Sequence, residues 1–190
     1  ERMIRASQVL FAKDMREIVR AAEGVRTAVF PKTVQRISPD AFQDVASLRS
    51  VVVDEALQSL SGDVRREADG TVVGAGPFSN SGLASIRLWS APRALGAGAL
   101  CQCKKLRGVQ LRSGLEEIDQ YCFCGSGVQR VSIPKSVTWL KSYAFSESDL
   151  REIAFEEPAL TNQMGDCCFQ KTQLEAIAIP SDVFLLHDKV

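Results

Sequence analysis

Apolar residues recur along this chain in a six-residue pattern: an apolar position, two variable positions, a second apolar position, one variable position and a third apolar position. The pattern begins seven times, at Val25 (VRTAVF), Leu48 (LRSVVV), Leu83 (LASIRL), Leu106 (LRGVQL), Val128 (VQRVSI), Leu150 (LREIAF) and Leu174 (LEAIAI). Successive starts are 23, 35, 23, 22, 22 and 24 residues apart. A period of roughly 20–29 residues is typical of solenoids, in which each repeat forms one coil.

Further positions recur in phase with this pattern. Apolar residues return nine positions after five of the starts and twelve positions after six of them, and a small residue then precedes a large apolar one. These pairs are Ala41–Phe42, Pro77–Phe78, Ala99–Leu100, Cys122–Phe123, Ala144–Phe145 and Cys168–Phe169. One coil cannot bury its own apolar edge, so the coils must stack, about 4.8 Å apart. The pattern predicts a parallel β-sheet of about seven short strands, in which Ile86, Val109 and Val131 lie side by side.

The repeat reads L-x-x-I-x-I-P-x-S-V-x-x-[IL]-x-x-x-A-F, and VQRVSIPKSVTWLKSYAF at residues 128–145 follows it most closely. This pattern resembles the BspA-like leucine-rich repeats over roughly residues 25–190. The resemblance implies a leucine-rich-repeat solenoid with an irregular or 3₁₀ convex side, used as a recognition scaffold, often at the cell surface, and without an active site. The chain departs from standard leucine-rich repeats in having only two asparagines, Asn80 and Asn162.

Residues 1–24 precede the repeats and form the first predicted unit. Their apolar residues fall on one helical face, and Gly24 is placed to end a helix. The face comprises Ile4, Phe11, Met15, Ile18 and Ala22. We expect a helix that caps the open end of the core; the alternative is an amphipathic helix that binds a partner.

The second predicted unit is the solenoid at residues 25–190, with an insertion at about residues 61–76. Asp69–Gly70 lies between short β-prone runs there, which favours a hairpin. The seventh repeat reaches Val190 just where its small–large pair should begin. Because an apolar cross-section is costly to expose, we expect that the chain continues beyond this end, or that another subunit covers it.

Composition excludes several classes of function. The 190 residues carry 23 basic and 23 acidic side chains, so bulk charge does not favour nucleic acid or anionic membranes. No apolar run approaches the roughly 20 residues of a membrane span. His187 is the sole histidine and has no evident nucleophile beside it. We therefore do not expect the protein to be an enzyme or to bind a cofactor.

The six cysteines allow three interpretations. Cys122 and Cys168 occupy the small-residue column and are predicted to be buried thiols. Cys101 and Cys124 follow the large residue of neighbouring coils, so a disulfide between them is geometrically possible. Zinc is disfavoured because Cys101-x-Cys103 and Cys122-x-Cys124 lack the two-residue spacer of common zinc modules.

The residues that alternate with the inward-facing apolar ones form the candidate binding surface. Ser85, Arg87 and Trp89 should face outward, and tryptophan and arginine are enriched in interface hot spots. The candidate partner-binding residues are Arg87, Trp89, Gln110, Arg112, Arg130, Ser132, Glu152 and Glu156. Trp89 could instead pack as a structural plug, and Trp139 could mark a second contact on the opposite side.

We therefore expect a non-catalytic scaffold that binds a protein through the concave sheet face, the exposed solenoid end, or both. The alternatives are an accessory structural subunit of a larger assembly and a carbohydrate- or ligand-binding surface module. The compartment stays open: cell surface by family resemblance, or intracellular as an assembly subunit.

Overall fold

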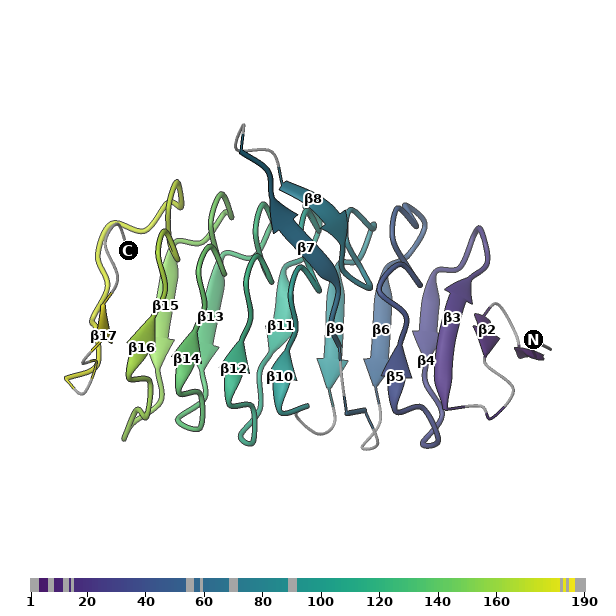
Figure 1. Ribbon diagram of the computed structural model, residues 1–190, viewed down its shortest axis with the longest axis horizontal. Coiled ribbons are helices and arrows are strands. Elements are labelled where there is room, and N and C mark those ends of the chain that lie inside the picture. Colours follow the sequence, from purple (N-terminus) through teal and green to yellow (C-terminus); the bar gives the residue numbers. More distant parts are fainter. Residues whose placement is uncertain are drawn as a thin grey trace.

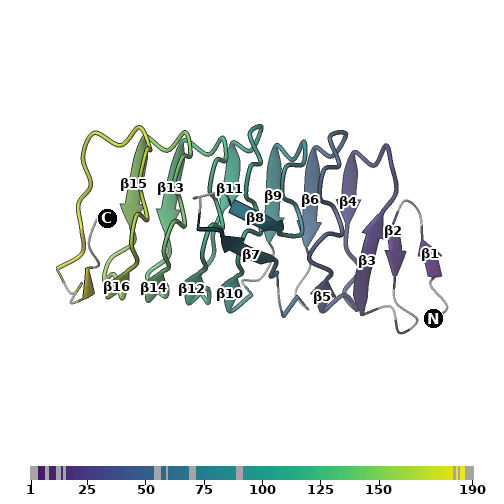
Figure 2. The ribbon, with the colours of Figure 1, turned by 45° about the horizontal axis from the view of Figure 1, so that its top comes forward.

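A computed structural model of the chain describes residues 4–6, 9–11, 14, 16–53, 57–58, 60–68, 72–88, 92–181, 183 and 185–186. Within these residues every helix or strand assigned is a β-strand. The strands belong to coils that follow one another along a nearly straight axis (Figures 1 and 2). The predicted parallel solenoid is confirmed.

The longer strands lie in one row, which we call the long-strand sheet. It comprises β4 (Thr27–Val29), β6 (Ser50–Val53), β9 (Ser85–Leu88), β11 (Gly108–Gln110), β13 (Arg130–Ile133) and β15 (Glu152–Phe155). Parallel pairing joins β4, β6, β9 and β11 in that order, and separately joins β13 to β15. Ile86 faces Val51 on one side and Val109 on the other, while Val131 faces Ile153. Figure 1 shows β13 next to β11, so the expected row of apolar residues is present.

The seventh predicted strand, which begins at Leu174, is absent from the structure. Residues 174–181 form no strand, although Leu174 and Ile177 still pack against the core. The long-strand sheet therefore has six strands in the part of the chain described here. The expectation that the chain continues or is covered at this end stays a prediction.

A second row of two-residue strands, which we call the short-strand sheet, lies across the core from the first (Figure 1). It contains β5 (Arg36–Ile37), β10 (Ala94–Leu95), β12 (Glu117–Ile118), β14 (Trp139–Leu140), β16 (Gln163–Met164) and β17 (Leu185–Leu186). Parallel pairing connects β10 to β17 in sequence order, and Leu60 bridges to Leu95. The prediction of an irregular or 3₁₀ convex side is therefore wrong in detail. Short strands form there because apolar residues of one column, such as Ile118 and Leu140, bring the backbones of successive coils into register.

The core is filled by columns of like residues. Ile118, Leu140 and Phe145 have no exposed surface, as the repeat predicts. The large residue of each coil stacks on its neighbours: ring centroids are 4.9 Å apart for Phe123–Phe145 and 5.9 Å for Phe145–Phe169. Each ring therefore shields its neighbours from water, and no coil has a core of its own.

The turns beside this aromatic column are joined by a backbone ladder. Phe123 N donates to Ala144 O at 2.7 Å, and Gly125 N donates to Ser146 O at 2.8 Å. Gly125 has φ 64°, and its equivalents Gln102 and Glu147 have φ 57° and 60°. This left-handed conformation recurs at one place in successive coils, where the amide donates to the next coil.

The predicted N-terminal helix is wrong. Residues there form β1 (Ile4–Ala6), β2 (Val9–Phe11) and β3 (Glu17–Ala21), with β2 antiparallel to both neighbours and β3 parallel to β5. Ile18 is fully buried beside Ile37, and Ser38 N donates to Ile18 O at 2.8 Å. A strand satisfies the open edge of the short-strand sheet, whereas a helix keeps its hydrogen bonds internal. That residues 1–24 cap the open end of the core stays a prediction.

Strands β7 (Asp63–Arg66) and β8 (Val72–Ala75) form an antiparallel hairpin, as predicted for this stretch; Asp69–Gly70 lies outside the described residues. The hairpin lies over the turns of the central coils (Figure 2). Val64 of β7 packs against a small cluster of Cys101, Tyr121 and Cys124. The hairpin therefore has an apolar base on the solenoid.

Two arginines join the turns of one coil to the next. Arg107 Nη1 donates to the carbonyls of Lys104 (2.9 Å) and Leu106 (3.1 Å) in its own coil and Gly127 (2.6 Å) in the next. Arg49 repeats this arrangement on Ala46, Leu48 and Gly82. Each arginine needs a glycine opposite it, since a Cβ on Gly127 would lie 1.8 Å from Arg107 Nη1 and 2.2 Å from Lys104 O.

We predict that Gly127→Ala lowers the free energy of unfolding by roughly 1–3 kcal/mol, because the added methyl displaces Arg107 and crowds a carbonyl. Gly108→Ala is the matched control, since its Cβ would meet only Ser85 Cβ, at 3.5 Å. Urea unfolding followed by circular dichroism measures both. Equal midpoints for Gly127→Ala and the wild type would contradict the packing described.

Candidate functional site

The outer surface of the long-strand sheet presents the columns predicted to bind a partner; we call it the sheet face. In β9 the side chains alternate, with Ser85 and Arg87 exposed and Ile86 and Leu88 buried. Pairing in register places like positions of successive coils next to each other, as for Ser85 and Gly108. The buried side chains therefore fix the exposed ones in continuous rows.

The structure places most of the predicted contact residues on this face. Arg87, Gln110, Arg130, Ser132, Glu152 and Glu156 are exposed, and Arg112 is half-buried. Trp89 lies outside the described residues. Val29, in β4, is 68% exposed and adds an apolar contact at the N-terminal end of the face.

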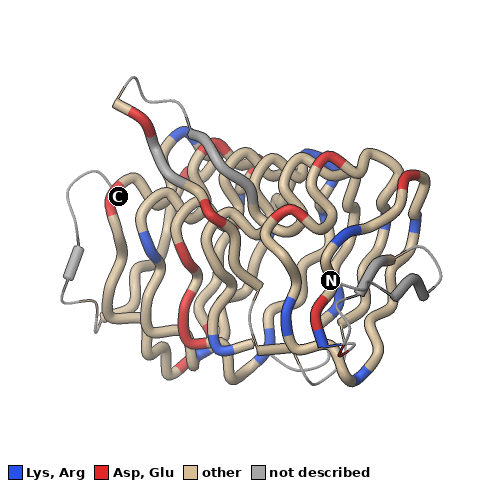
Figure 3. The backbone as a smooth tube through the Cα atoms, turned by 45° about the vertical axis from the view of Figure 1, so that its right-hand side comes forward, with Lys and Arg blue, Asp and Glu red and all other residues tan. Residues whose placement is uncertain are grey.

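Charge on the sheet face changes sign along the solenoid. Its central coils carry Arg87 and Arg112, and the coil that contains β15 carries Glu152 and Glu156. Arg130 lies between them, with its Nε 3.0 Å from Glu152 Oε2. Both partners of this ion pair are largely exposed, so it adds little stability. Elsewhere the two signs are interspersed (Figure 3), so electrostatic recognition would have to be local.

A shallow hollow interrupts the face between β9 and β11. It has a volume of about 230 Å³ and is lined by Ser85, Ile86, Arg87, Gly108, Val109 and Gln110. The hollow exists because Gly108 contributes no side chain to its outward column. The sequence-based prediction selected Arg87 and Gln110 but missed Gly108, whose signal was a glycine inside a strand pattern.

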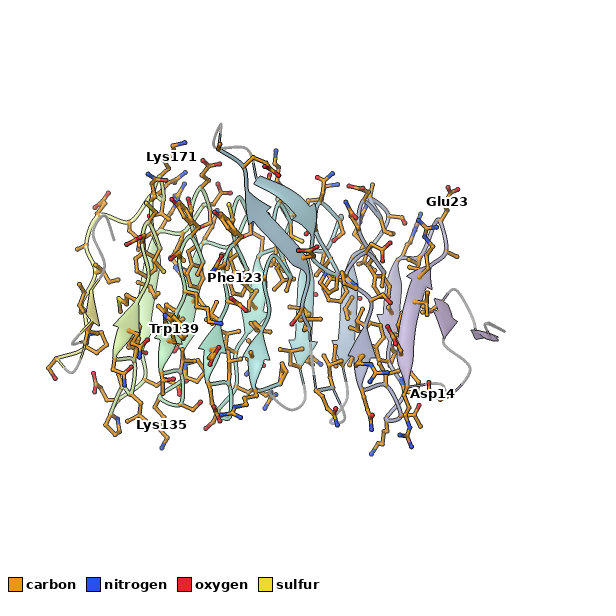
Figure 4. All side chains as sticks on the ribbon, in the orientation of Figure 1. Asp14, Glu23, Phe123, Lys135, Trp139 and Lys171 are labelled. Carbon is orange, nitrogen blue, oxygen red and sulfur yellow. The ribbon has the colours of Figure 1, made fainter. Side chains whose placement is uncertain are left out.

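Trp139 lies on the opposite side, in β14 (Figure 4). Lys141 Nζ is 4.8 Å from its ring centroid, 3.0 Å from Glu117 Oε2 and 3.3 Å from Asp119 Oδ1. Burial lowers the pKa of Lys141, but the two carboxylates outweigh burial and raise it above its usual value. The groups of this cluster already bind one another within the protein.

All six cysteines are free and buried, so the alternative of a Cys101–Cys124 disulfide is not what the structure contains. Burial raises the pKa of Cys103 to about 11 and that of Cys168 to about 12. Cys103 Sγ also donates to Phe78 O at 2.9 Å. The described residues include no group of three or more His, Cys, Asp or Glu side chains that could hold a metal ion.

The repeat family follows from a comparison with known families. Six copies of the BspA-type leucine-rich repeat region match residues 21–64 and 71–190. The chain belongs to this family. Proteins of this kind are typically non-catalytic, and the family suggests a protein-binding or surface role. No curated protein matches the chain in sequence.

Two solved structures share the fold of this BspA-type repeat protein. A leucine-rich cell surface protein from Faecalibacterium prausnitzii matches with a TM-score of 0.55 at 15% identity, over 92% of this chain and 55% of its own. A leucine-rich repeat protein from Eubacterium ventriosum matches with a TM-score of 0.62 at 12% identity, over 93% and 51% respectively. The chain spans about half the length of either structure. Among the described residues there is no helix long and apolar enough to cross a membrane.

The buried thiols predict how stability depends on pH. Their folded pKa values lie above the unfolded value, so the unfolded chain loses these protons first and stability falls as pH rises above about 8.5. We expect Cys168→Ala to flatten this fall between about pH 9 and 11, since alanine fills the same column at Ala144. Urea midpoints measured at several pH values test this. An unchanged slope would show that Cys168 ionises equally easily in both states.

Proposed function

We propose that this protein is a non-catalytic binding module that engages a protein partner through the sheet face. The most direct support is that exposed side chains stand in rows on a rigid scaffold, because in-register pairing of the strands fixes the place of each row. Arg87, Gln110 and Ser132 each lie on a strand whose inward residues fix its position, so little conformational freedom is lost on binding.

The order of side chains along the face favours one orientation of the partner. Val29 offers an apolar contact at one end, arginines occupy the centre, and Glu152 and Glu156 lie at the other end. A complementary partner would present apolar, acidic and basic groups in that order. We include Trp89 as an anchor beside Arg112 on the strength of the sequence pattern alone.

A role at the cell surface is the version of this proposal that we favour. One structural neighbour is a leucine-rich cell surface protein, and the repeat family is consistent with a surface module. An accessory subunit of a larger assembly is the alternative, in which an end of the solenoid, rather than the sheet face, would be the principal contact.

The test compares two charge-adding double variants as baits for capture and mass spectrometry. Val29→Lys with Ser132→Arg changes exposed positions of the sheet face, and Gln120→Lys with Gln170→Arg makes the matched change at exposed turns. We expect the first variant to lose at least about tenfold of the captured partner and the second to retain it. Equal recovery with both baits would contradict binding through the sheet face.

A further inference from the structure

A second hollow, away from the sheet face, lies over the turn that precedes β9; we call it the turn hollow. It has a volume of about 180 Å³ and is lined by Ala46, Asn80, Ser81, Gly82, Gln102, Lys104 and Lys105. Ser81 and Gly82 are buried and form its floor, whereas Lys104 and Lys105 are exposed at its rim. The lining residues and the residues that flank them in sequence all belong to the described part of the chain.

The turn hollow exists because the middle one of three successive turns is one residue shorter than the other two. The turns at residues 43–47 and 101–105 have five residues each, and the turn at residues 79–82 has four. Backbone hydrogen bonds of 3.0 and 2.9 Å join the short turn to the long turn on either side of it. The extra residue of each long turn therefore leaves a space over the short one.

The lining of the turn hollow is positively charged. Lys104 and Lys105 bring two ammonium groups, and none of the lining residues is acidic. Neither lysine forms an ion pair with any residue that the structure describes. Two carboxylates of neighbouring turns already have partners: Asp44 Oδ1 accepts from Asn80 Nδ2 at 2.8 Å, and Asp149 Oδ2 lies 3.9 Å from a guanidinium nitrogen. An anion could therefore bind both lysines without displacing a partner from either.

Two arginines occupy backbone carbonyls that would otherwise repel an anion. Arg49 Nη1 donates to Ala46 O at 2.7 Å and to Gly82 O at 3.4 Å. Arg107 Nη1 donates to Lys104 O at 2.9 Å. These three carbonyls belong to lining residues, so the positive charge of the guanidiniums offsets the partial negative charge of their oxygens.

Size and charge together favour a phosphate group as the ligand. The volume of about 180 Å³ exceeds that of several water molecules, at roughly 30 Å³ each, and has room for one phosphorus and four oxygen atoms. Lysine binds phosphate as a point charge, and two lysines match the roughly two negative charges of a phosphate group at neutral pH. A carboxylate carries one charge and is matched better by the planar fork of an arginine, whereas no arginine lines the turn hollow.

We propose that the turn hollow is a binding site for a phosphate group, either free or carried as a monoester on a larger molecule. Lys104 and Lys105 would bind its oxygens over the floor formed by Ser81 and Gly82. The inference does not rest on the proposed protein contact, because no lining residue belongs to the sheet face.

The test titrates the ¹⁵N-labelled protein with inorganic phosphate and, separately, with glycerol phosphate, at constant ionic strength. We expect saturable shifts of the Asn80, Lys104 and Lys105 amides, with a dissociation constant of about 5 mM or tighter. Tighter binding of inorganic phosphate would support the free ion as the ligand, and equal or tighter binding of glycerol phosphate would support a phosphate carried on a larger molecule. No saturable shift with either compound, or equal affinity for acetate, would overturn the proposal.

Charge-removing variants provide the second arm. Lys104→Gln with Lys105→Gln should weaken phosphate binding at least about tenfold, because both ammonium groups are lost. Lys32→Gln with Lys135→Gln removes the same charge at exposed positions elsewhere and should leave the affinity unchanged. Unchanged affinity in the first variant, or an equal loss in both, would overturn the proposal.

Discussion

The structure depends on one constraint: a coil of this chain can bury its apolar edge only against another coil. Ile118, Leu140 and Phe145 have no exposed surface because the equivalent residues of neighbouring coils cover them. The backbone follows the same rule, since Phe123 N and Gly125 N donate into the next turn and not within their own. Side-chain burial and amide pairing thus act along a single axis, so loss of one coil would expose the next.

Register along this axis determines the surface as well as the core. The same pairing that stacks Ile86 on Val109 places Arg87 beside Gln110 on the outer side of the sheet. A surface built in this way needs no loops, because the sequence position of a residue within its repeat fixes its row. The hollow at Gly108 is an extreme case, in which one missing side chain shapes the surface without affecting the core.

Sequence periodicity predicted what repeats and failed where the repeat ends. Columns such as Ala144–Phe145 recur often enough to identify the coils and their inward faces. Residues 1–24 carry no repeat, so helical spacing was the sole guide to them; pairing of Ile18 with the strand at Ile37 depends on an open sheet edge that local spacing does not reveal. The short-strand sheet and the hollow at Gly108 likewise arise from neighbouring coils, and no single repeat contains them.

Engineered disulfides test the in-register stacking of coils most directly. Ser85 and Gly108 face each other, and a Cβ on Gly108 would lie 3.5 Å from Ser85 Cβ, within the range that a disulfide spans. Ser85→Cys with Gly108→Cys should cross-link on mild oxidation, whereas Ser85→Cys with Gln110→Cys is displaced by two residues and should not. Peptide mapping by mass spectrometry identifies the bond. Cross-linking of the displaced pair, or of neither pair, would contradict the parallel, in-register solenoid.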